Sequence, residues 1–342
     1  MPPFRGRTAE PADPLPLIDP AKTFPRLNRA YNTVFQPERL TIGLVVPLAR
    51  YPDSAVPDMA RHLDRAQMAD ALGFSALWLR DVPFNVPSFG DAGQVFDPFV
   101  YLGALAATTR KIALGVASIV LPLRHPAHVA KAAASADVLS GGRLLLGVAS
   151  GDRPEEYPAL DRGFADRGAR FRDSVDYIRT MAQPYPQRDL DHGRLSGGIN
   201  MLPKPTGGQV PLLITGGSQQ SPDWVARNGD GWMTYPRDAA AQGRVVAAYR
   251  QQIRAAGLPD KPVMQSLYVD LVDQADAPPR PIHLGFQSGT EYLRRYLFQL
   301  RDLGINHVAL NLRFNGAATE PTLQRLADEI LPDFASTGDD HD

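Results

Sequence analysis

The chain has 342 residues, 44% of them hydrophobic, and a formal net charge of -1 with acidic and basic residues interspersed. This size suits one large domain or two ordinary ones. The small net charge argues against binding to nucleic acid or to an anionic membrane, and a small neutral or anionic ligand is favoured. The lack of cysteine excludes disulfides, thiolate catalysis and thiolate metal sites.

The two ends of the chain differ in composition from its middle. Residues 1–38 are rich in proline and poor in apolar periodicity, so we expect an N-terminal arm outside the fold. The tail 336–342, which reads STGDDHD, is expected to be flexible. There is no apolar core typical of a signal peptide and no apolar run of membrane-spanning length. We therefore predict a cytoplasmic protein with one domain over residues 39–335.

Short apolar runs rich in β-branched residues alternate with longer segments of helical periodicity. The runs are TIGLVV (41–46), SALWLRD (75–81), KIALGVASIV (111–120), RLLLGVAS (143–150), PLLIT (211–215), GWMTY (231–235), PVMQSLYVDL (262–271) and HVALNLRF (307–314). Eight βα units in one chain predict an α/β fold, a (β/α)8 TIM barrel with loop insertions. A doubly wound open sheet is the alternative.

Two connections are longer than plain linkers. Residues 184–209 are rich in glycine and proline, and residues 272–289 contain PPRP. In a compact domain such lengths are typical of lids or binding loops. We expect both connections to cover the functional site.

A parallel barrel carries its active site at the C-terminal ends of the strands. The polar residues expected around one pocket there are Asp81, Arg124, His125, Asp152, Arg153, Ser218, Ser221 and Arg237. None of the five lysines follows a strand, which excludes a Schiff-base aldolase. A metal site would need His125 and His128 to converge with carboxylates, yet Pro126 opens a helix that leaves His125 as its cap. We assign no metal.

The segment PLLITGGSQQSPDWVA (211–226) joins a strand to a helix. Gly216 and Gly217 let backbone N–H groups approach an anion, and Ser218 and Ser221 add hydroxyl donors at a helix N-terminus. The same residues also fit a simple helix cap, with Ser221 preceding the first-turn proline. A rival anion cup is HLGFQSGTEYL (283–293), which lies near the last two strands.

The run GVASIVLPLRHPAHVAKAAASADVLSGGRLLLGVASGDRPEEYPAL (115–160) resembles the bacterial luciferase-like flavin-dependent oxidoreductases. The third strand leads through LP and HP into a helix, and SGGR opens the fourth strand. The similarity extends over residues 41–335 and includes SPDWVARNGDGW (221–232). The resemblance implies a (β/α)8 barrel that binds FMN, or in some branches a deazaflavin, at its C-terminal mouth.

The resemblance also implies roles for individual residues. Ala117 and Ser118 match a pair joined by a non-prolyl cis peptide against the isoalloxazine ring. Hydroxyls that bind the cofactor phosphate correspond to Ser218 and Ser221, beside Gly216 and Gly217. The segment that touches ribityl and phosphate contains Ser150, Asp152 and Arg153.

Two positions depart from the light-emitting luciferases. Those enzymes carry a catalytic histidine after the second strand, where this chain has RDVPF, and a phosphate-binding arginine where this chain has Ser150. Bioluminescence is therefore not expected. Asp81 and His125 are the candidates to position substrate or to move a proton.

We predict a flavin-dependent monooxygenase that uses reduced FMN, supplied by a flavin reductase, and dioxygen to oxidise a small organic substrate. The cofactor supplies the chemistry, while the protein binds, orients and excludes water. A homodimer is expected, because members of the family often pair. The alternatives are a deazaflavin-dependent hydride-transfer oxidoreductase and a non-catalytic flavin-binding protein.

Overall fold

A computed structural model describes residues 23–190 and 193–334. The first 22 residues and the predicted tail 336–342 lie outside the described residues. None of the helices in the described ranges has both the length and the apolar character needed to cross a membrane.

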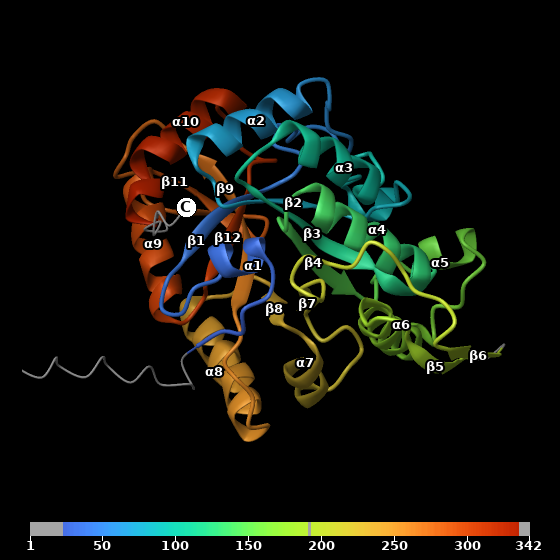
Figure 1. Ribbon diagram of the computed structural model, residues 1–342. Helices are drawn as coiled ribbons and strands as arrows, with labels where there is room; N and C mark the ends of the chain where they lie inside the picture. The colour runs from blue at the N-terminus through green and yellow to red at the C-terminus, as the bar shows by residue number, and fades with distance from the viewer. Residues whose placement is uncertain (1–22, 191–192, 335–342) are drawn as a thin grey trace, which may run out of the picture.

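Eight parallel strands form a closed barrel, which confirms the predicted fold and excludes the open sheet (Figure 1). Each pairs with its neighbours in the order β1–β2–β3–β4–β7–β8–β9–β12, and β12 pairs with β1 to close the ring. Every strand lies within one of the predicted apolar runs. The strands are β1 (Thr41–Val45), β2 (Ala76–Leu79), β3 (Ala113–Val120), β4 (Leu144–Ala149), β7 (Leu212–Thr215), β8 (Gly231–Thr234), β9 (Val263–Leu271) and β12 (His307–Asn311).

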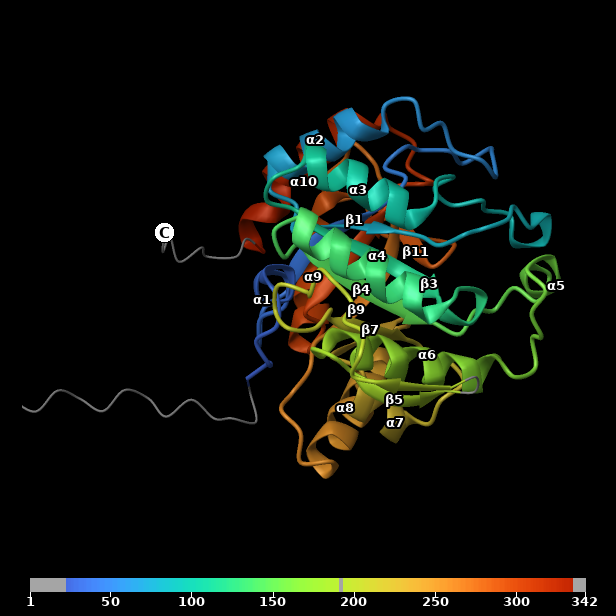
Figure 2. The same ribbon diagram turned by 45° about the vertical axis from the view of Figure 1, so that its right-hand side comes forward.

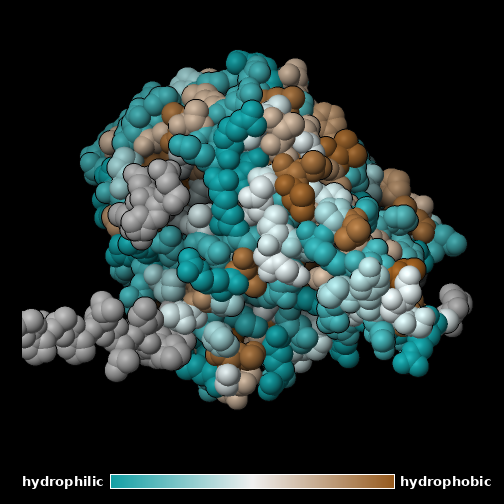
Figure 3. All heavy atoms as spheres, viewed as in Figure 1, coloured by the Kyte–Doolittle hydropathy of each residue, from teal (hydrophilic) through white to brown (hydrophobic). Residues whose placement is uncertain are grey.

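Helices surround the barrel and cover the outer face of its strands (Figure 1). Several begin with proline after a side-chain cap: Asp97 caps α3, His125 caps α4 and Ser221 caps α7. The surrounding helices are α2 (His62–Leu72), α3 (Pro98–Thr108), α4 (Pro126–Leu139), α6 (Arg167–Ala182), α7 (Pro222–Asn228), α8 (Ala239–Ala255), α9 (Thr290–Asp302) and α10 (Thr319–Glu329). The face seen in Figure 3 is mainly hydrophilic, with apolar side chains scattered over it.

A buried hydrogen-bonded chain fills the N-terminal half of the barrel. The indole Nε1 of Trp78 donates to Nε2 of His307 at 2.8 Å, so the proton of the imidazole is on Nδ1, which lies 2.7 Å from Oγ1 of Thr41. The Thr41 hydroxyl in turn donates to the carbonyl of Val34 at 2.8 Å. Burial lowers the pKa of His307 to about 3, so this imidazole is neutral at physiological pH.

The short helix α1 (Arg29–Val34) closes this end of the barrel, opposite α5 (Glu156–Ala159) in Figure 2. The buried side chains of Ala30, Tyr31, Val34 and Phe35 belong to the interior cluster with Trp78. The hydroxyl of Tyr31 also donates to the carbonyl of Asp230 at 2.7 Å. The prediction that residues 1–38 lie outside the fold is therefore wrong for this part of the segment. Burial of α1 side chains at the open end of the barrel removes apolar surface from water.

The two long connections lie in different places. Residues 184–209 contain the hairpin of β5 (Gln187–Leu190) and β6 (Gly193–Ser196), and they join a helix to a strand, α6 to β7. Such a connection enters the barrel at its N-terminal end, and none of its described residues lines the mouth, so the prediction of a lid is wrong there. Residues 272–289 follow β9 and form β10 (Arg280–Ile282) and β11 (Gly285–Ser288), which extend the sheet beside the mouth.

We expect Tyr31→Ala to lower the free energy of unfolding by about 3–5 kcal/mol, the cost of removing a large buried side chain and leaving a cavity. Urea denaturation measures this change. Arg29→Ala, a substitution at an exposed position of the same helix, serves as the control and should change stability by less than about 0.5 kcal/mol. Equal, small effects of both substitutions would mean that α1 does not hold the barrel closed.

Candidate active site

A cavity of about 470 Å³ opens at the C-terminal ends of the strands. Its floor is apolar and is shared with the interior cluster, because Val45, Met233, Met264 and Ala309 belong to both. The loops after β2 and β4 and the hairpin after β9 form its wall, with Phe89 and Leu284 on the rim. This position is where a parallel barrel carries its active site.

The structure brings most of the predicted site residues together around this cavity. The residues that line it are Asp81, Ala117, Ser118, Ser150, Asp152, Arg153, Gly216, Gly217 and Ser218. His125 and Ser221 do not line it. Nor do Arg124 and Arg237, which the sequence also placed at the mouth.

His125 and Ser221 are helix caps. The Nδ1 atom of His125 accepts a hydrogen bond from the N–H of Ala127 at 3.2 Å, and Oγ of Ser221 accepts from the N–H of Trp224 at 3.2 Å. Both residues are exposed. Each precedes the first-turn proline of its helix, which turns the side chain back along the helix and away from the cavity. His125 is therefore not placed to move a proton at this site.

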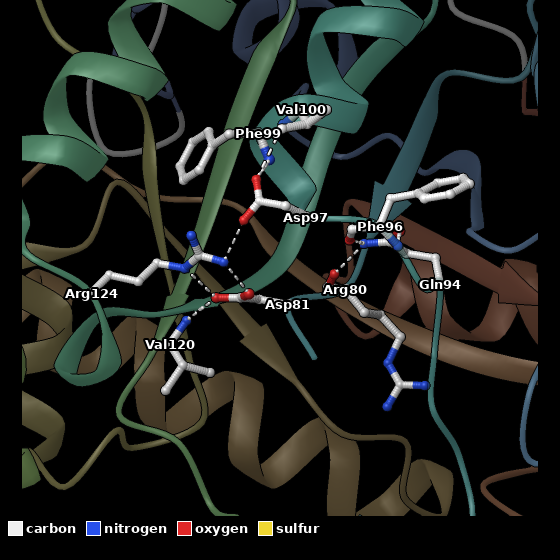
Figure 4. A network of polar contacts seen from close by, with 9 residues as sticks. All are labelled: Arg80, Asp81, Gln94, Phe96, Asp97, Phe99, Val100, Val120 and Arg124. Atoms are coloured by element: carbon white, nitrogen blue, oxygen red, sulfur yellow. Dashed lines mark hydrogen bonds and ion pairs between the residues drawn. The ribbon is translucent and has the colours of Figure 1, made fainter. Parts of the chain in front are cut away.

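Asp81 is held on both of its oxygens (Figure 4). Arg124 donates to Oδ2 through Nε at 3.0 Å and to Oδ1 through Nη2 at 2.7 Å, and the N–H of Val120 donates to Oδ2 at 3.1 Å. The same Nη2 reaches Asp97, the cap of α3, at 3.0 Å. The bidentate pair with Arg124 and the bond from Val120 hold this carboxylate in place, and it positions the end of β3. The prediction that Asp81 moves a proton is corrected to this positioning role.

The floor of the cavity on the β3 side is a bulge. The register between β3 and β4 shifts between Val116 and Ile119, and the peptide between Ala117 and Ser118 is cis, as the resemblance implies. The hydroxyl of Ser118 forms a hydrogen bond with that of Thr215 on β7. Gly147 leaves room for this contact, because a Cβ there would lie 3.1 Å from Oγ of Ser118.

Residues 216–219 form a loop with unpaired backbone donors. Gly216, Ser218 and Gln219 have φ values of 54°, 44° and 61°, a conformation that is uncommon outside glycine and is found at functional sites. Within the described residues, the N–H groups of positions 217–219 make no hydrogen bond. Such a run of N–H groups forms an anion-binding concavity.

The rival anion cup at 283–293 is filled by the protein itself. The N–H of Gly289 donates to the carbonyl of Ala277 at 3.1 Å, and the N–H of Glu291 donates to that of Ala275 at 3.0 Å. A Cβ at Gly289 would lie 2.1 Å from the carbonyl oxygen of Ala275, so the two segments are in close contact. The N-terminus of α9 therefore has no free donors at these positions.

Two cationic side chains line the cavity from the segment between β4 and α6. Arg167 stacks on Phe164, with 3.7 Å from its guanidinium carbon to the ring centroid, and Arg153 stacks on Phe89 at 4.7 Å. The backbone next to Arg167 lies against this loop, since a Cβ at Gly168 would lie 2.8 Å from Cβ of Gln219, and the amide of Gln220 donates to the carbonyl of Gly168 at 2.8 Å. Nη1 of Arg153 and Nε of Arg167 are buried without a hydrogen-bond partner. We call the free N–H groups of residues 217–219 and the guanidinium of Arg167 the cradle. It offers positive charge and free donors to an anion.

Sequence reasoning missed Arg167 and Glu156. Arg167 starts α6, well beyond the charged residues that directly follow β4, and the basic run RGARFR was the available signal. Glu156 is buried on the cavity wall with Oε1 at 3.8 Å from Nη1 of Arg153, and neither atom has a hydrogen-bond partner. Burial raises the pKa of Glu156 to about 7, although Arg153 opposes the shift.

The family model for luciferase-like monooxygenases matches residues 40–339. The chain belongs to this family. Relatives of assigned activity are monooxygenases and a dehydrogenase, so the chain is a luciferase-like oxidoreductase. This agrees with the barrel, the bulge after Val116 and the cavity at the mouth.

Several relatives of known sequence are similar over part of the chain. An uncharacterised protein of Mycobacterium tuberculosis is 29% identical over 59% of this chain and 75% of its own length. The 4-hydroxyprotoasukamycin monooxygenase of Streptomyces nodosus is 30% identical over 42% of this chain and 38% of its own. An F420-dependent hydroxymycolic acid dehydrogenase of M. tuberculosis is 27% identical over 58% and 54%.

Solved structures share the fold. The monooxygenase RslO1 of Streptomyces bottropensis has a TM-score of 0.72 and 20% identity, covering 86% of this chain and 100% of its own. An F420-dependent secondary alcohol dehydrogenase has a TM-score of 0.69 and 17% identity, covering 86% and 98%.

The raised pKa of Glu156 predicts a pH-dependent stability. In the folded protein the pKa is about 7 against an ordinary value of 4.5, so between these values the folded state binds more protons than the unfolded state. Stability then falls as the pH rises through this window, by about 1–3 kcal/mol for this group. Glu156→Gln should flatten the decline of the unfolding free energy between pH 5 and 8.

The exposed neighbour Glu155 supplies the control, because Glu155→Gln removes the same charge outside the cavity wall. Urea denaturation of the three proteins at both pH values makes the comparison. An identical slope in Glu156→Gln and in the unsubstituted protein would contradict the assignment.

Proposed function

We propose that the protein is a flavin-dependent monooxygenase that binds reduced FMN and uses dioxygen to oxidise a small organic substrate. The single observation that carries the proposal is the cradle at the mouth, formed by the free N–H groups of residues 217–219 and the guanidinium of Arg167. A phosphate monoester matches this donor set, which combines charge with several N–H groups.

The rest of the cavity suits a flat ring system. Its floor is apolar, and the bulge at Ala117 and Ser118 forms one wall. When bound, the flavin supplies the redox chemistry with dioxygen. The chain's part is to anchor the phosphate, to orient the ring against the bulge and to exclude water through Phe89 and Leu284 at the rim. The proposal includes a separate flavin reductase and a homodimer.

Asp81 and Arg124 serve this function indirectly. Arg124 holds the carboxylate of Asp81, and this carboxylate accepts from the N–H of Val120 at the end of β3, directly after the bulge. Asp81 is held by Arg124 and His125 lies outside the cavity, whereas Glu156 is buried in the cavity wall, where Asp152 is exposed, so Glu156 is placed to exchange a proton near neutral pH. Its buried position and its pKa of about 7 support this role.

A deazaflavin-dependent hydride transfer is the second candidate. It is favoured by the similarity to the F420-dependent hydroxymycolic acid dehydrogenase and to the F420-dependent alcohol dehydrogenase. The phosphate cradle and the apolar floor suit either cofactor, so the two candidates differ in the chemistry of the ring and not in the site.

Cofactor titration and turnover test the function. We expect FMN to bind at least tenfold more tightly than riboflavin, because riboflavin lacks the phosphate and each hydrogen bond to a charged group contributes about 1.5–3 kcal/mol. With a flavin reductase, NADH and a panel of substrates, dioxygen should be consumed beyond the rate of free flavin. Tight binding of deazaflavin with no oxygen consumption would select the second candidate.

The two serines of the glycine-rich loop give a matched pair of variants. Oγ of Ser218 donates to the carbonyl of Thr215 at 2.7 Å and lies on the cavity wall, whereas Ser221 caps α7 outside it. When FMN binds, the Ser218 hydroxyl would turn from the carbonyl of Thr215 to the phosphate, so Ser218→Ala should weaken binding by about 1–3 kcal/mol, and Ser221→Ala should leave it unchanged. Isothermal titration measures both. The reverse ranking would move the phosphate site away from residues 216–219.

A further inference from the structure

A buried ion cluster lies at the mouth, away from the phosphate cradle. The carboxylate of Asp91 accepts hydrogen bonds from the N–H of Gly93 at 2.8 Å and from the hydroxyl of Tyr51 at 3.1 Å. It also pairs with the guanidinium groups of Arg80 and Arg313, the latter at 3.1 Å. Two arginines therefore share one carboxylate, and the three side chains carry a net charge of +1.

Arg80 is the member of this cluster that lines the cavity, whereas Asp91 and Arg313 do not. It follows Trp78 by two residues, so its side chain points to the same inner face of the barrel. Nη1 is engaged by Asp91, while within the described residues Nε and Nη2 make no hydrogen bond. Figure 4 shows the Arg80 side chain directed away from the Asp81–Arg124 pair.

Arg80 and the phosphate cradle lie on different sides of the mouth. The end of β2 carries Arg80 and the end of β7 carries residues 216–219, and β3 and β4 separate these strands along one side of the barrel. The same cavity is lined by residues 216–219 and by Arg80, so a flavin with its phosphate at residues 217–219 would have this space for its ring system. On reduction, the ring gains a negative charge that is delocalised over its pyrimidine edge, and a nearby fixed cation stabilises it.

We propose that Arg80 is a positioning residue for the reduced form of the cofactor. Because Arg80 shares the carboxylate of Asp91 with Arg313, its guanidinium keeps part of its positive charge, and it holds the negative charge of the reduced ring at the end of the cavity opposite the phosphate. The inference rests on the proposed flavin site and applies equally to a deazaflavin, which carries the same pyrimidine edge. Its consequence is a preference for the reduced over the oxidised cofactor, which an oxygen-using enzyme supplied by a separate reductase needs in order to capture its cofactor.

The test measures the affinities for oxidised and for dithionite-reduced FMN under anaerobic conditions. It also measures the midpoint potential of the bound cofactor. Arg80→Gln should weaken binding of reduced FMN at least tenfold more than binding of oxidised FMN. For a two-electron couple, that tenfold change lowers the midpoint potential by about 30 mV. Arg80→Lys keeps the charge and should restore most of the preference.

Two further variants separate the charge of Arg80 from the integrity of the cluster. Asp91→Asn removes the counter-ion and keeps an acceptor for the same donors, so it should shift the preference in the opposite direction, toward tighter binding of reduced FMN. Arg313→Gln leaves Asp91 to Arg80 alone, so it should shift the ratio in the same direction as Arg80→Gln but by a smaller factor, because Arg313 lies outside the cavity. Circular dichroism checks that each variant is folded.

An unchanged ratio in Arg80→Gln, or equal shifts in Arg80→Gln and Arg313→Gln, would overturn the inference. If Arg80→Gln does not fold, the Asp91→Asn variant decides. An unchanged binding preference in that variant, or a preference shifted toward oxidised FMN, would then count against the inference. Failure of the unsubstituted protein to bind either FMN or a deazaflavin would instead overturn the proposed function. Binding with no role for Arg80 would leave that function intact.

Discussion

The filling of the barrel interior sets the position of the functional site. Trp78 occupies the space beside Gly115, where a Cβ would lie 2.3 Å from the indole, and it is held by its hydrogen bond to His307. With α1 closing the end, buried side chains fill the N-terminal half of the barrel. The upper half ends in Met233, Met264 and Ala309, which form the floor of the cavity. A ligand at the mouth therefore rests on the same cluster that stabilises the fold.

Buried carboxylates hold the loops around that floor. Asp91 joins the ends of β2 and β12 to the loop after β1, and Asp81 joins the end of β2 to those of β3 and α3. Asp270 does the same after β9, since it accepts from Gln287 at 2.6 Å and from the N–H of Gly316 at 2.7 Å. Each carboxylate is matched by several donors, which offsets the cost of its burial. The mouth is thereby preorganised before any ligand binds.

The strands and the location of the site could be predicted from the sequence, because apolar runs of strand length recur and parallel strands end on one face. Whether a side chain after a strand faces the cavity could not be predicted from its position in the sequence alone. His125 and Ser221 follow their strands as Ser150 and Ser218 do, yet the proline after each turns it into a helix cap. The length of the connection 184–209 is typical of a lid, but this connection joins a helix to a strand and therefore lies at the N-terminal end of the barrel. Glu156 and the packing of α1 depend on contacts between segments distant in sequence, which no local pattern contains.

The charges that line the cavity follow from these same constraints. Three carboxyl groups line the cavity: Asp81 is paired with Arg124, and burial favours the protonated form of Glu156, so among them the exposed Asp152 is the one that is neither paired nor buried. The guanidinium groups at the two ends, Arg167 and Arg80, are under-compensated. An apolar floor between two cationic ends favours a ligand that is flat and apolar in its middle and negative at both ends. A reduced flavin phosphate has this distribution of charge, whereas an oxidised one is negative only at its phosphate.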